Sequence, residues 1–427
     1  MEVRYIKNLL NFLIEVGKLK KMPRTGFVWL GIKNPETIAQ HTYRVAIMNW
    51  ILGRKTKPQL NIGRVIKMSL VHDLCEVYAG DMTPYWGLLP RDKEKRKEIL
   101  KRWIRLTKKV KERKERGKFQ KEKKALQKIT KNLDLSLKKE ITDCWLDYER
   151  LFSKEGRFVK QGDKVETLLQ ALEYWGSQPD SPVFGWWEEV EDLVDNPILL
   201  EFLEKIEKKF YHRRKINGEL ECLLEIGKLK NMPRRGWVLR RVKNPETIAE
   251  HGFLLAMASW ILGRRQKLNL EKILKMSLIY ELCEVYAGDA TPYDELLPSD
   301  RRKVILKRWP RFSKKEKERR FLKDYKEEKK ALEKITSRLP LILKKEIISL
   351  WDEYKRRQTP EGRFVNQLYW LTTYLQALQY FKKDKKFPIL AWYEQMREFI
   401  EDSELLKLME EMEKKYLPKQ LNFDSFN

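Results

Sequence analysis

The chain is poor in the two residue types that most often build small reactive sites. It has four cysteines and four histidines among 427 residues, and no two cysteines stand in a CxxC spacing. Four cysteines cannot form a disulfide scaffold for a chain of this length, so we expect a reducing, cytoplasmic setting. Histidine chemistry must come from His41, His72, His212 or His251. Of these, His212 lies in KKFYHRRK, a segment typical of a solvated linker.

Long apolar runs are missing as well. No stretch approaches the ~18 apolar residues that a bilayer-spanning helix needs. The N-terminal segment MEVRYIKNLLNFLIEVGKLKKMPR interrupts its apolar residues with charge and offers no small-residue cleavage site, so we expect no signal peptide. Alternating apolar and polar residues bounded by turn dipeptides are also missing, which predicts essentially no sheet.

Acidic residues are too few to balance the basic ones. The formal net charge is +28 and the isoelectric point is about 9.7. Residues 91–131 hold 20 Lys/Arg against 6 Asp/Glu, and residues 299–338 hold 17 against 7. These two basic inserts, at net +14 and +10, indicate an anionic partner. The mixture of Lys with Glu inside them is equally typical of solvated helices joined by ion pairs.

The sequence repeats itself. FLIEVGKLKKMPRTGFVWLGIKNPETIAQH returns 210 residues later as CLLEIGKLKNMPRRGWVLRRVKNPETIAEH, and KMSLVHDLCEVYAGDMTPY returns 208 residues later as KMSLIYELCEVYAGDATPY. The segment EGRFV recurs after 206 residues. The chain therefore consists of two copies of one domain, which we place at 1–210 and 211–427.

The apolar spacing in each copy predicts helices. In the first copy, one predicted helix follows NPET and contains His41, with Asn34 or Thr37 as its N-cap and Gly53 just after its end. A second is predicted over VIKMSLVHDLCEVYAG, ending at Gly80, and a third over GRFVKQGDKVETLLQALEYW. We therefore predict an all-α fold.

Ionisable side chains interrupt these apolar helices of the first copy. His72 and Asp73 are adjacent, and Glu76 follows one helical turn later, on roughly the same face. Burying such groups is costly unless they satisfy one another. Imidazole and carboxylate groups brought together from three helices suit a divalent metal ion. The predicted ligands are His41, His72, Asp73 and Asp163, with Glu76 and Asp81 beside them.

The second copy provides an internal control. It keeps His251, Glu284 and Asp289 at the positions of His41, Glu76 and Asp81, but carries Tyr280, Glu281 and Tyr369 in place of His72, Asp73 and Asp163. Neutral tyrosine is a poor ligand for a catalytic divalent ion. Because three of four ligands changed while LCEVYAGD stayed identical, we expect the second copy to be metal-free and inactive.

Four segments of the first copy resemble the HD-domain phosphohydrolase superfamily, and most closely its 5′-deoxynucleotidase branch. They are KMPRTGFV (21–28), NPETIAQHTYRVA (34–46), LVHDLCEVYAGDMTP (70–84) and EGRFVKQGDKVETLLQALEY (155–174). The resemblance covers nearly all of both copies apart from the basic inserts. Two departures are Gly162, where the family usually has a larger residue, and the length and charge of the inserts.

The resemblance implies roles for these residues. His41, His72, Asp73 and Asp163 would bind one divalent transition metal (Mn, Co, Ni, Fe or Zn). Glu76 would be the catalytic acid or base, Asp81 a contact to the substrate sugar or to water, and Arg24 the phosphate contact. Since the family is commonly dimeric, the chain would be two tandem HD-domain bundles arranged as a fused pseudo-dimer.

A metal-dependent phosphohydrolase that acts on nucleoside (deoxy)5′-monophosphates is the function that these patterns favour. Two other functions remain open. The basic inserts would suit a nucleic-acid-binding protein or an HD nuclease, although they carry few aromatic residues for stacking. The second copy would suit a nucleotide sensor that uses Arg234, His251, Glu284 and Asp289. We interpret Glu36 as a first-turn helix carboxylate, and Trp186 and Trp187 as core or inter-copy contacts.

Overall fold

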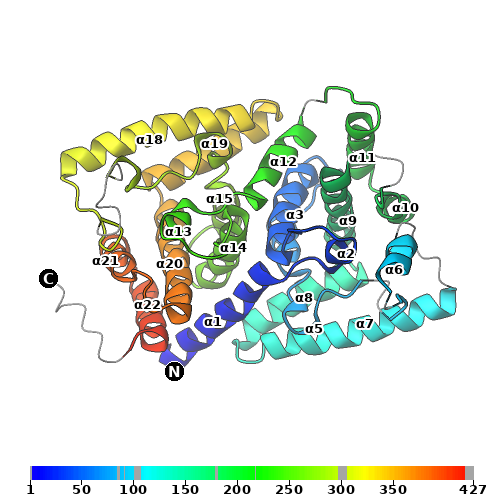
Figure 1. Ribbon diagram of the computed structural model, residues 1–427, viewed down its shortest axis with the longest axis horizontal. Coiled ribbons are helices and arrows are strands. Elements are labelled where there is room, and N and C mark those ends of the chain that lie inside the picture. The colour runs from blue at the N-terminus through cyan, green and yellow to red at the C-terminus, as the bar shows by residue number, and fades with distance from the viewer. Residues whose placement is uncertain are drawn as a thin grey trace. The chain divides into compact units, whose positions relative to one another are not determined.

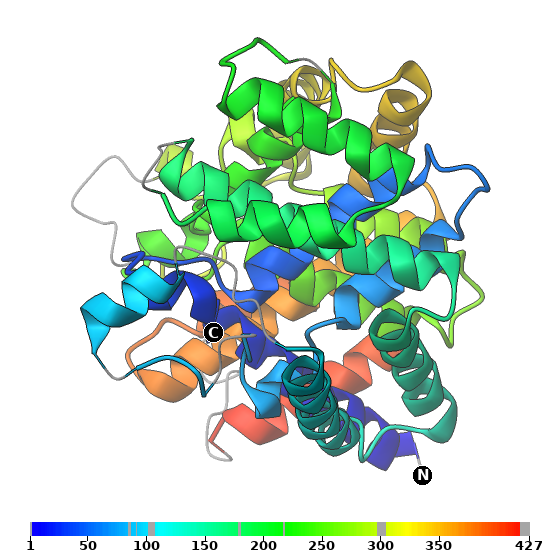
Figure 2. The same ribbon diagram turned by 90° about the vertical axis from the view of Figure 1, so that its right-hand side faces the viewer.

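The computed structural model describes residues 2–83, 87–90, 92–100, 107–177, 181–216, 218–296 and 305–418. Within these ranges the regular structure is helical, and both views show coiled ribbons without strand arrows (Figures 1 and 2). The predicted all-α fold is therefore confirmed. None of the helices in these ranges combines the length and the apolar character needed to cross a membrane.

The helices form two compact units, and residues 14–224 make up the one that carries the HD dipeptide. We call it the first-copy unit. Its elements are η1 (Gly17–Lys21), α2 (Thr25–Trp29), α3 (Ile38–Gly53), α4 (Ile62–Val71), α5 (Glu76–Ala79), α6 (Lys93–Leu100), α7 (Lys108–Ile129), α8 (Leu135–Arg150), α9 (Lys154–Trp175), α10 (Phe184–Leu193) and α11 (Pro197–Phe210).

The second-copy unit consists of residues 1–13 and 225–427. Its elements, labelled in Figure 1 where there is room, repeat those of the first copy. They are η2 (Lys228–Lys230), α13 (Arg235–Leu239), α14 (Ile248–Gly263), α15 (Leu270–Ile279), α16 (Glu284–Ala287), η3 (Asp294–Leu296), α18 (Lys314–Ile335), α19 (Leu341–Arg356), α20 (Pro360–Lys383), α21 (Leu390–Phe399) and α22 (Ser403–Tyr416).

Two helices are shared between the units. The start of α1 (Glu2–Val16) belongs to the second-copy unit, where Lys407 Nζ lies 2.8 Å from Glu2 Oε1. The start of α12 (Glu219–Gly227) belongs to the first-copy unit, where Lys55 Nζ lies 3.1 Å from Glu219 Oε1. By sequence repeat, the start of α1 belongs to the first copy and the start of α12 to the second. By contacts, each belongs to the unit of the other copy.

Helix α3 lies at the centre of the first-copy unit. All 16 of its residues are buried, and it packs against α4 and α9. Thr37 is its N-cap, in a reciprocal capping box with Gln40, so Thr37 rather than Asn34 starts the helix. Every face of α3 therefore contacts protein, so each polar side chain on this helix needs a hydrogen-bond or ion-pair partner inside the unit.

The second predicted helix is not continuous, which corrects the sequence prediction. Residues 72–75 form turns between α4 and α5, closed by hydrogen bonds from Leu74 N to Val71 O and from Glu76 N to Asp73 O. The second copy has the same break after α15, although tyrosine stands there in place of His72. The break therefore belongs to the packing of this fold and does not depend on the metal-ligand residues.

Much of the two basic inserts consists of the long helices α7 and α18, while residues 91, 101–106 and 299–304 lie outside the described ranges. Helix α7 packs against α5 and α18 against α16. On α7, Glu122 is only 3% exposed and lies 3.4 Å from Lys118. Part of each insert is therefore a wall of its domain, so its charge cannot be assigned wholly to an external partner.

Candidate metal centre

A short pairing of two loops places Arg24 beside the central helix. Arg24 N–H donates to Glu36 O at 2.9 Å and Ile38 N–H donates to Met22 O at 2.9 Å, around an isolated bridge between Pro23 and Thr37. The KMPR segment is thus fixed to the start of α3. Its arginine begins a short helix whose next residue, Thr25, is also anchored, as described below.

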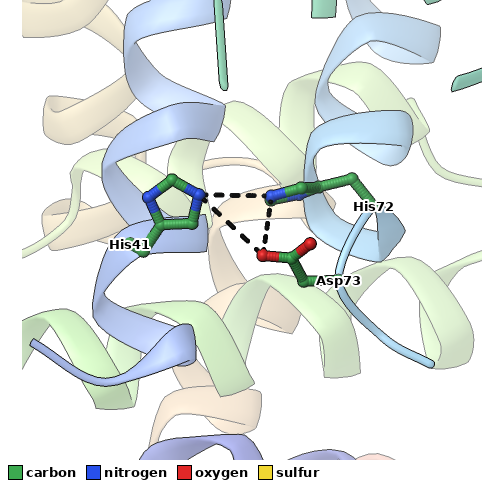
Figure 3. A group of neighbouring side chains, drawn as sticks. All are labelled: His41, His72 and Asp73. Carbon is green, nitrogen blue, oxygen red and sulfur yellow. Dashed lines mark hydrogen bonds and ion pairs between the residues drawn. The ribbon is translucent and has the colours of Figure 1, made fainter. Parts of the chain in front are cut away.

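The four predicted ligands come together. His41 is on α3, His72 and Asp73 are in the turn after α4, and Asp163 is on α9. The two Nε2 atoms of the imidazoles are 3.3 Å apart, and Asp73 Oδ2 is 3.2 Å from His72 Nε2 (Figure 3). Asp163 Oδ1 lies 3.0 Å from His41 Nε2 and 3.8 Å from His72 Nε2. His41, His72 and Asp73 form a group that could hold a metal ion.

Both imidazoles are oriented by hydrogen bonds on their far side. His72 Nδ1 lies 2.7 Å from Ser69 O, a carbonyl that can only accept, so His72 donates there and presents Nε2 as a lone pair. His41 Nδ1 lies 2.5 Å from Glu166 Oε2, which favours the same tautomer. Two imidazole Nε2 atoms and two carboxylates that face one point form a mixed nitrogen and oxygen donor set of the kind that binds a divalent cation.

The carboxylates of the centre remain ionised although they are buried. Burial raises the pKa of Asp73, but His72 and Arg24 outweigh it and hold the pKa well below its usual range. Burial likewise raises the pKa of Asp163, but Lys164 and the two imidazoles outweigh it and lower that pKa further. Burial and Arg24 lower the pKa of His41, yet Glu166 and Asp163 raise it to about 9. The centre therefore attracts positive charge.

A buried network behind His41 was missed at the sequence level. Arg44 Nε donates to Glu166 Oε1 at 2.6 Å, and its other nitrogens donate to Gln170 and Glu173. The signal was present, because Glu166 follows Asp163 by three residues and so lies on the same side of α9. Glu36, interpreted as a first-turn carboxylate, instead precedes the N-cap and lies 3.8 Å from His41 Nδ1.

Glu76 has the surroundings of a proton donor. Its side chain is 3% exposed, and Oε2 has no hydrogen-bond partner within the described residues. Burial, together with the charges of Asp73 and Asp81, raises the pKa of Glu76 well above its usual range. These surroundings favour the protonated form of the carboxyl, one turn from the ligands and at the wall of the cavity described next.

Arg24 and Asp81 close one side of the centre. Arg24 Nη1 donates to Asp73 Oδ2 at 2.7 Å, and Arg24 Nε is 3.9 Å from Asp81 Oδ2. The backbone N–H of Thr25 donates to the same Asp81 oxygen at 2.6 Å. Asp81 thus holds the loop that carries Arg24, a role that sequence reasoning did not assign to it.

A cavity of about 140 Å³ opens beside the ligands. Arg24, Asp73, Glu76, Asp81 and Asp163 line it, and so does Trp186, which the sequence predicts to be a core or inter-copy contact. Three lysines on its wall are each paired with a carboxylate: Lys118 with Glu122 at 3.4 Å, Lys160 with Glu149 at 3.0 Å and Lys164 with Glu189 at 3.3 Å. The cavity wall therefore carries cations that suit a negatively charged ligand next to the metal-ligand residues.

The second copy has changed more than its ligands. Leu254 and Thr372 stand where the first copy has Arg44 and Glu166, and Asp324, Asn366 and Trp370 stand where it has the three lysines. Within the described residues, groups of His, Cys, Asp and Glu that could hold a metal ion occur in the first copy alone. The second copy therefore lacks three of the four metal ligands, the residues that hydrogen-bond behind His41, and the lysines of the cavity wall.

Arg234 takes a different position from its counterpart Arg24. Its Nη1 lies 2.5 Å from His251 Nδ1, its Nη2 donates to Tyr369 OH at 2.5 Å and is 3.5 Å from Glu281. A guanidinium thus lies among the residues that replace the ligands, and it lowers the pKa of the buried Glu281 less than burial raises it. Arg235 N–H keeps the bond to Asp289 at 2.6 Å that Thr25 makes to Asp81.

A family model of the HD domain matches residues 16–185 and 226–409. The chain is 36% identical over 168 residues to "5′-deoxynucleotidase HDDC2" of Xenopus laevis, which is 39% of this chain and 70% of that protein. It is 32% identical over 207 residues to the Homo sapiens protein of the same name, 48% of this chain and 80% of that one. A solved structure of a conserved hypothetical protein from Pyrococcus furiosus is 26% identical, with a TM-score of 0.34, over 46% of this chain and 98% of its own. The family model accounts for most of the sequence in two successive segments, and the chain belongs to the HD domain family.

Proposed function

We propose that the first copy hydrolyses nucleoside 5′-monophosphates, deoxynucleotides among them, to nucleoside and phosphate with the help of one divalent transition metal. One observation carries the proposal: four nitrogen and oxygen donors face one point beside a cavity lined by Arg24 and by Glu76, whose pKa burial raises. The similarity to proteins named 5′-deoxynucleotidase supports the same substrate class.

The metal would be held by His41, His72, Asp73 and Asp163. When bound, a divalent ion supplies Lewis acidity toward a phosphate oxygen and makes water a better nucleophile at neutral pH. Two imidazoles with two carboxylates form a mixed donor set that suits Mn, Co, Ni, Fe or Zn. The hydrogen bonds from the far side of each imidazole would keep the ligands in place during turnover.

The chain's own groups would bind the phosphate and move a proton. Arg24 presents a planar guanidinium at the cavity wall, which suits bidentate binding of phosphate oxygens. Lys118, Lys160 and Lys164 would turn from their carboxylates toward the substrate. Glu76, held neutral, would protonate the departing 5′-oxygen. Asp81 would contact the sugar or a water while it holds the Arg24 loop.

We propose the two repeats, 1–210 and 211–427, as the domains of a fused pseudo-dimer in the cytoplasm, with the second as an inactive partner. The repeat itself and the loss of ligands in the second copy support this division of labour.

Phosphate release from a panel of ribo- and deoxynucleoside 5′-monophosphates tests the function. The chelated protein is supplied with Mn, Co, Ni or Mg, and wild type is compared with Asp73→Ala and Glu281→Ala. We expect metal-dependent release that Asp73→Ala abolishes and Glu281→Ala leaves intact. Metal binding without release from any mononucleotide would contradict the proposal.

A second function rests on the charge of the basic inserts. Exposed basic residues of α7 and α18 would bind nucleic-acid phosphates without sequence preference. Binding to a random duplex is measured at rising salt, beside a variant with four exposed lysines of α7 changed to glutamine. A salt slope that this variant leaves unchanged rules out the inserts as the contact.

A further inference from the structure

The second copy has its own cavity, and its chemistry differs from that of the first. It measures about 70 Å³ and lies beside Arg234, but its walls are mainly aromatic. The residues that matter here are Trp237, Tyr293, Trp309, Trp370, Trp392 and Gln395. Aromatic walls bind flat rings by stacking and edge contacts, whereas the first cavity has charged walls.

Unsatisfied polar atoms border this cavity. Gln395 is 2% exposed, and its Oε1 accepts no hydrogen bond within the described part of the chain. The Nε1 atoms of Trp370 and Trp392 are also buried without an acceptor there. Arg240 also lines the cavity, and its Nε is buried without an acceptor in the described residues. Native proteins seldom leave several such groups unpaired around one cavity, so one acceptor and three donors are available to a ligand.

The residues that line this cavity differ in chemical character from their first-copy counterparts. In the first copy, Lys164 and Glu189 form an ion pair at 3.3 Å on the cavity wall. Their counterparts are Trp370 and Gln395, a stacking surface and an amide. Arg234, the residue expected to contact phosphate, is occupied by His251, Tyr369 and Glu281. The cavity has exchanged an ion pair for a stacking surface and an amide, which suit a planar, hydrogen-bonding ring.

The volume limits the size of that ring. A cavity needs ~10–15 Å³ by this measure for each water, so 70 Å³ corresponds to about five waters. That is room for one flat ring the size of a base, and an acceptor beside N–H donors matches a ring N–H flanked by carbonyl groups, as in uracil and thymine. We propose that the second copy binds the pyrimidine ring of a base, nucleoside or nucleotide, with Gln395 Oε1 accepting from a ring N–H and the tryptophan N–H groups donating to ring carbonyls.

The proposal is independent of hydrolysis, and binding alone tests it. Full-length Asp73→Ala protein, treated with chelator, is titrated calorimetrically with uracil, uridine, thymidine and their 5′-monophosphates. Adenosine, whose ring has no N–H between two carbonyl groups, is the control for the hydrogen-bond pattern. We expect one site per chain, a preference of at least tenfold for pyrimidines over adenosine, and similar affinity with and without the phosphate. Equal affinity for adenosine, or no heat at millimolar ligand, would overturn the proposal.

Matched variants locate the site. Gln395→Met removes the acceptor at nearly constant volume and should weaken binding at least tenfold, while Glu189→Met changes the equivalent position of the first copy and should leave it unaffected. Trp370→Lys restores the first-copy residue and should also abolish binding, and Trp370→Phe keeps the ring without the N–H as a milder version. Circular dichroism confirms that each variant folds. Binding that falls with Glu189→Met but survives Gln395→Met assigns the ring to the first cavity instead, and contradicts the proposal.

Discussion

The two copies share one scaffold and differ in the chemistry placed on it. Both begin their central helix with a threonine capping box, both break the following helix after α4 or α15, and both anchor the arginine loop through an aspartate. Only the first assembles two imidazoles with two carboxylates. The features that hold the arginine loop and the helix break therefore do not require the metal-ligand residues, and persist where those residues are gone.

The copies also show two ways of balancing buried charge. In the first, carboxylates surround His41 and draw positive charge to the centre. In the second, the guanidinium of Arg234 supplies that charge from within the chain. In the second copy a guanidinium therefore lies among the residues that replace the ligands, while burial raises the pKa of the neighbouring Glu281 to about 8.

Replacing the matching histidine in each copy, His41 or His251, should give the largest difference. His41→Ala should abolish metal binding and lower phosphate release by ~10³-fold or more, because several kcal/mol of charge stabilisation are lost and each 1.36 kcal/mol is tenfold. His251→Ala should leave both quantities unchanged. Metal content is measured by elemental analysis and release by a phosphate assay. If the ion stays bound in the His41 variant and is lost from the His251 variant, the second copy and not the first holds the metal.

The acid–base role predicts the next largest effect. Glu76→Gln should lower the rate of phosphate release ~10²- to 10³-fold, within the range of general acid catalysis, while metal content stays the same. Glu284→Gln, its second-copy equivalent, serves as the control and should have full activity. A drop in metal content that matches the drop in rate would make Glu76 a structural or ligand residue.

Replacing the residues that hydrogen-bond behind His41 with those of the second copy should lower the affinity for the metal. Arg44→Leu leaves Glu166 buried without its guanidinium, so we expect metal affinity to fall ~10- to 100-fold, as for other residues behind a ligand. Stability should fall by ~3–5 kcal/mol, the cost of breaking a buried pair. Adding Glu166→Thr should recover much of the stability and none of the affinity. Denaturant unfolding and metal titration separate the two effects.

Packing beside Asp163 offers a smaller, purely steric comparison. A Cβ on Gly162 would lie 1.8 Å from Asn49 Oδ1, whereas the second copy pairs Leu368 with Ser259. Gly162→Ala should therefore destabilise the protein by ~1–3 kcal/mol through overpacking. Adding Asn49→Ser should restore most of it. If the double variant is no more stable than the single one in thermal unfolding, the two positions are not coupled.

The smallest expected effect is a pH dependence confined to the second copy. Burial, with the charges of Asp289 and Glu246, outweighs Arg234 and raises the pKa of Glu281 from 4.5 to about 8. A raised folded-state pKa stabilises the protein below the unfolded value, and this contribution is lost as the pH rises from about 4.5 to 8. Glu281→Gln should flatten the melting temperature over that window. An unchanged profile would mean that Glu281 is ionised throughout.

The convergence of the four ligands was predictable because ionisable groups on apolar helices have few ways to be satisfied. His41, His72, Asp73 and Asp163 all lie where water is excluded, so they had to meet one another or a shared partner. Glu166 could have been added from its spacing to Asp163. Arg44 gave no such signal, because an arginine in a helical sequence is usually solvated and its burial follows from tertiary packing.

Two features of the fold had no signal in the sequence. The break at residues 72–75 falls in a segment with good helical spacing, and is imposed by the packing of its neighbours. The exchange of α1 and α12 leaves every local pattern unchanged, because the two copies have similar surfaces and either could receive either helix. A repeated sequence shows that a helix fits the surface of a copy, but it does not show whether the helix packs in its own copy or in the other.

That exchange gives a reason why a copy without its ligands would be kept. Ile6, Leu9 and Leu10 of α1 are buried in the second-copy unit, about 400 residues away along the chain, at 2%, 1% and 1% exposure. A chain that lost the second repeat would lose most of the unit to which residues 1–13 belong, and a chain that lost those residues would lose part of the same unit. Each unit therefore draws on residues from both repeats, which ties the two repeats to one another in the fold.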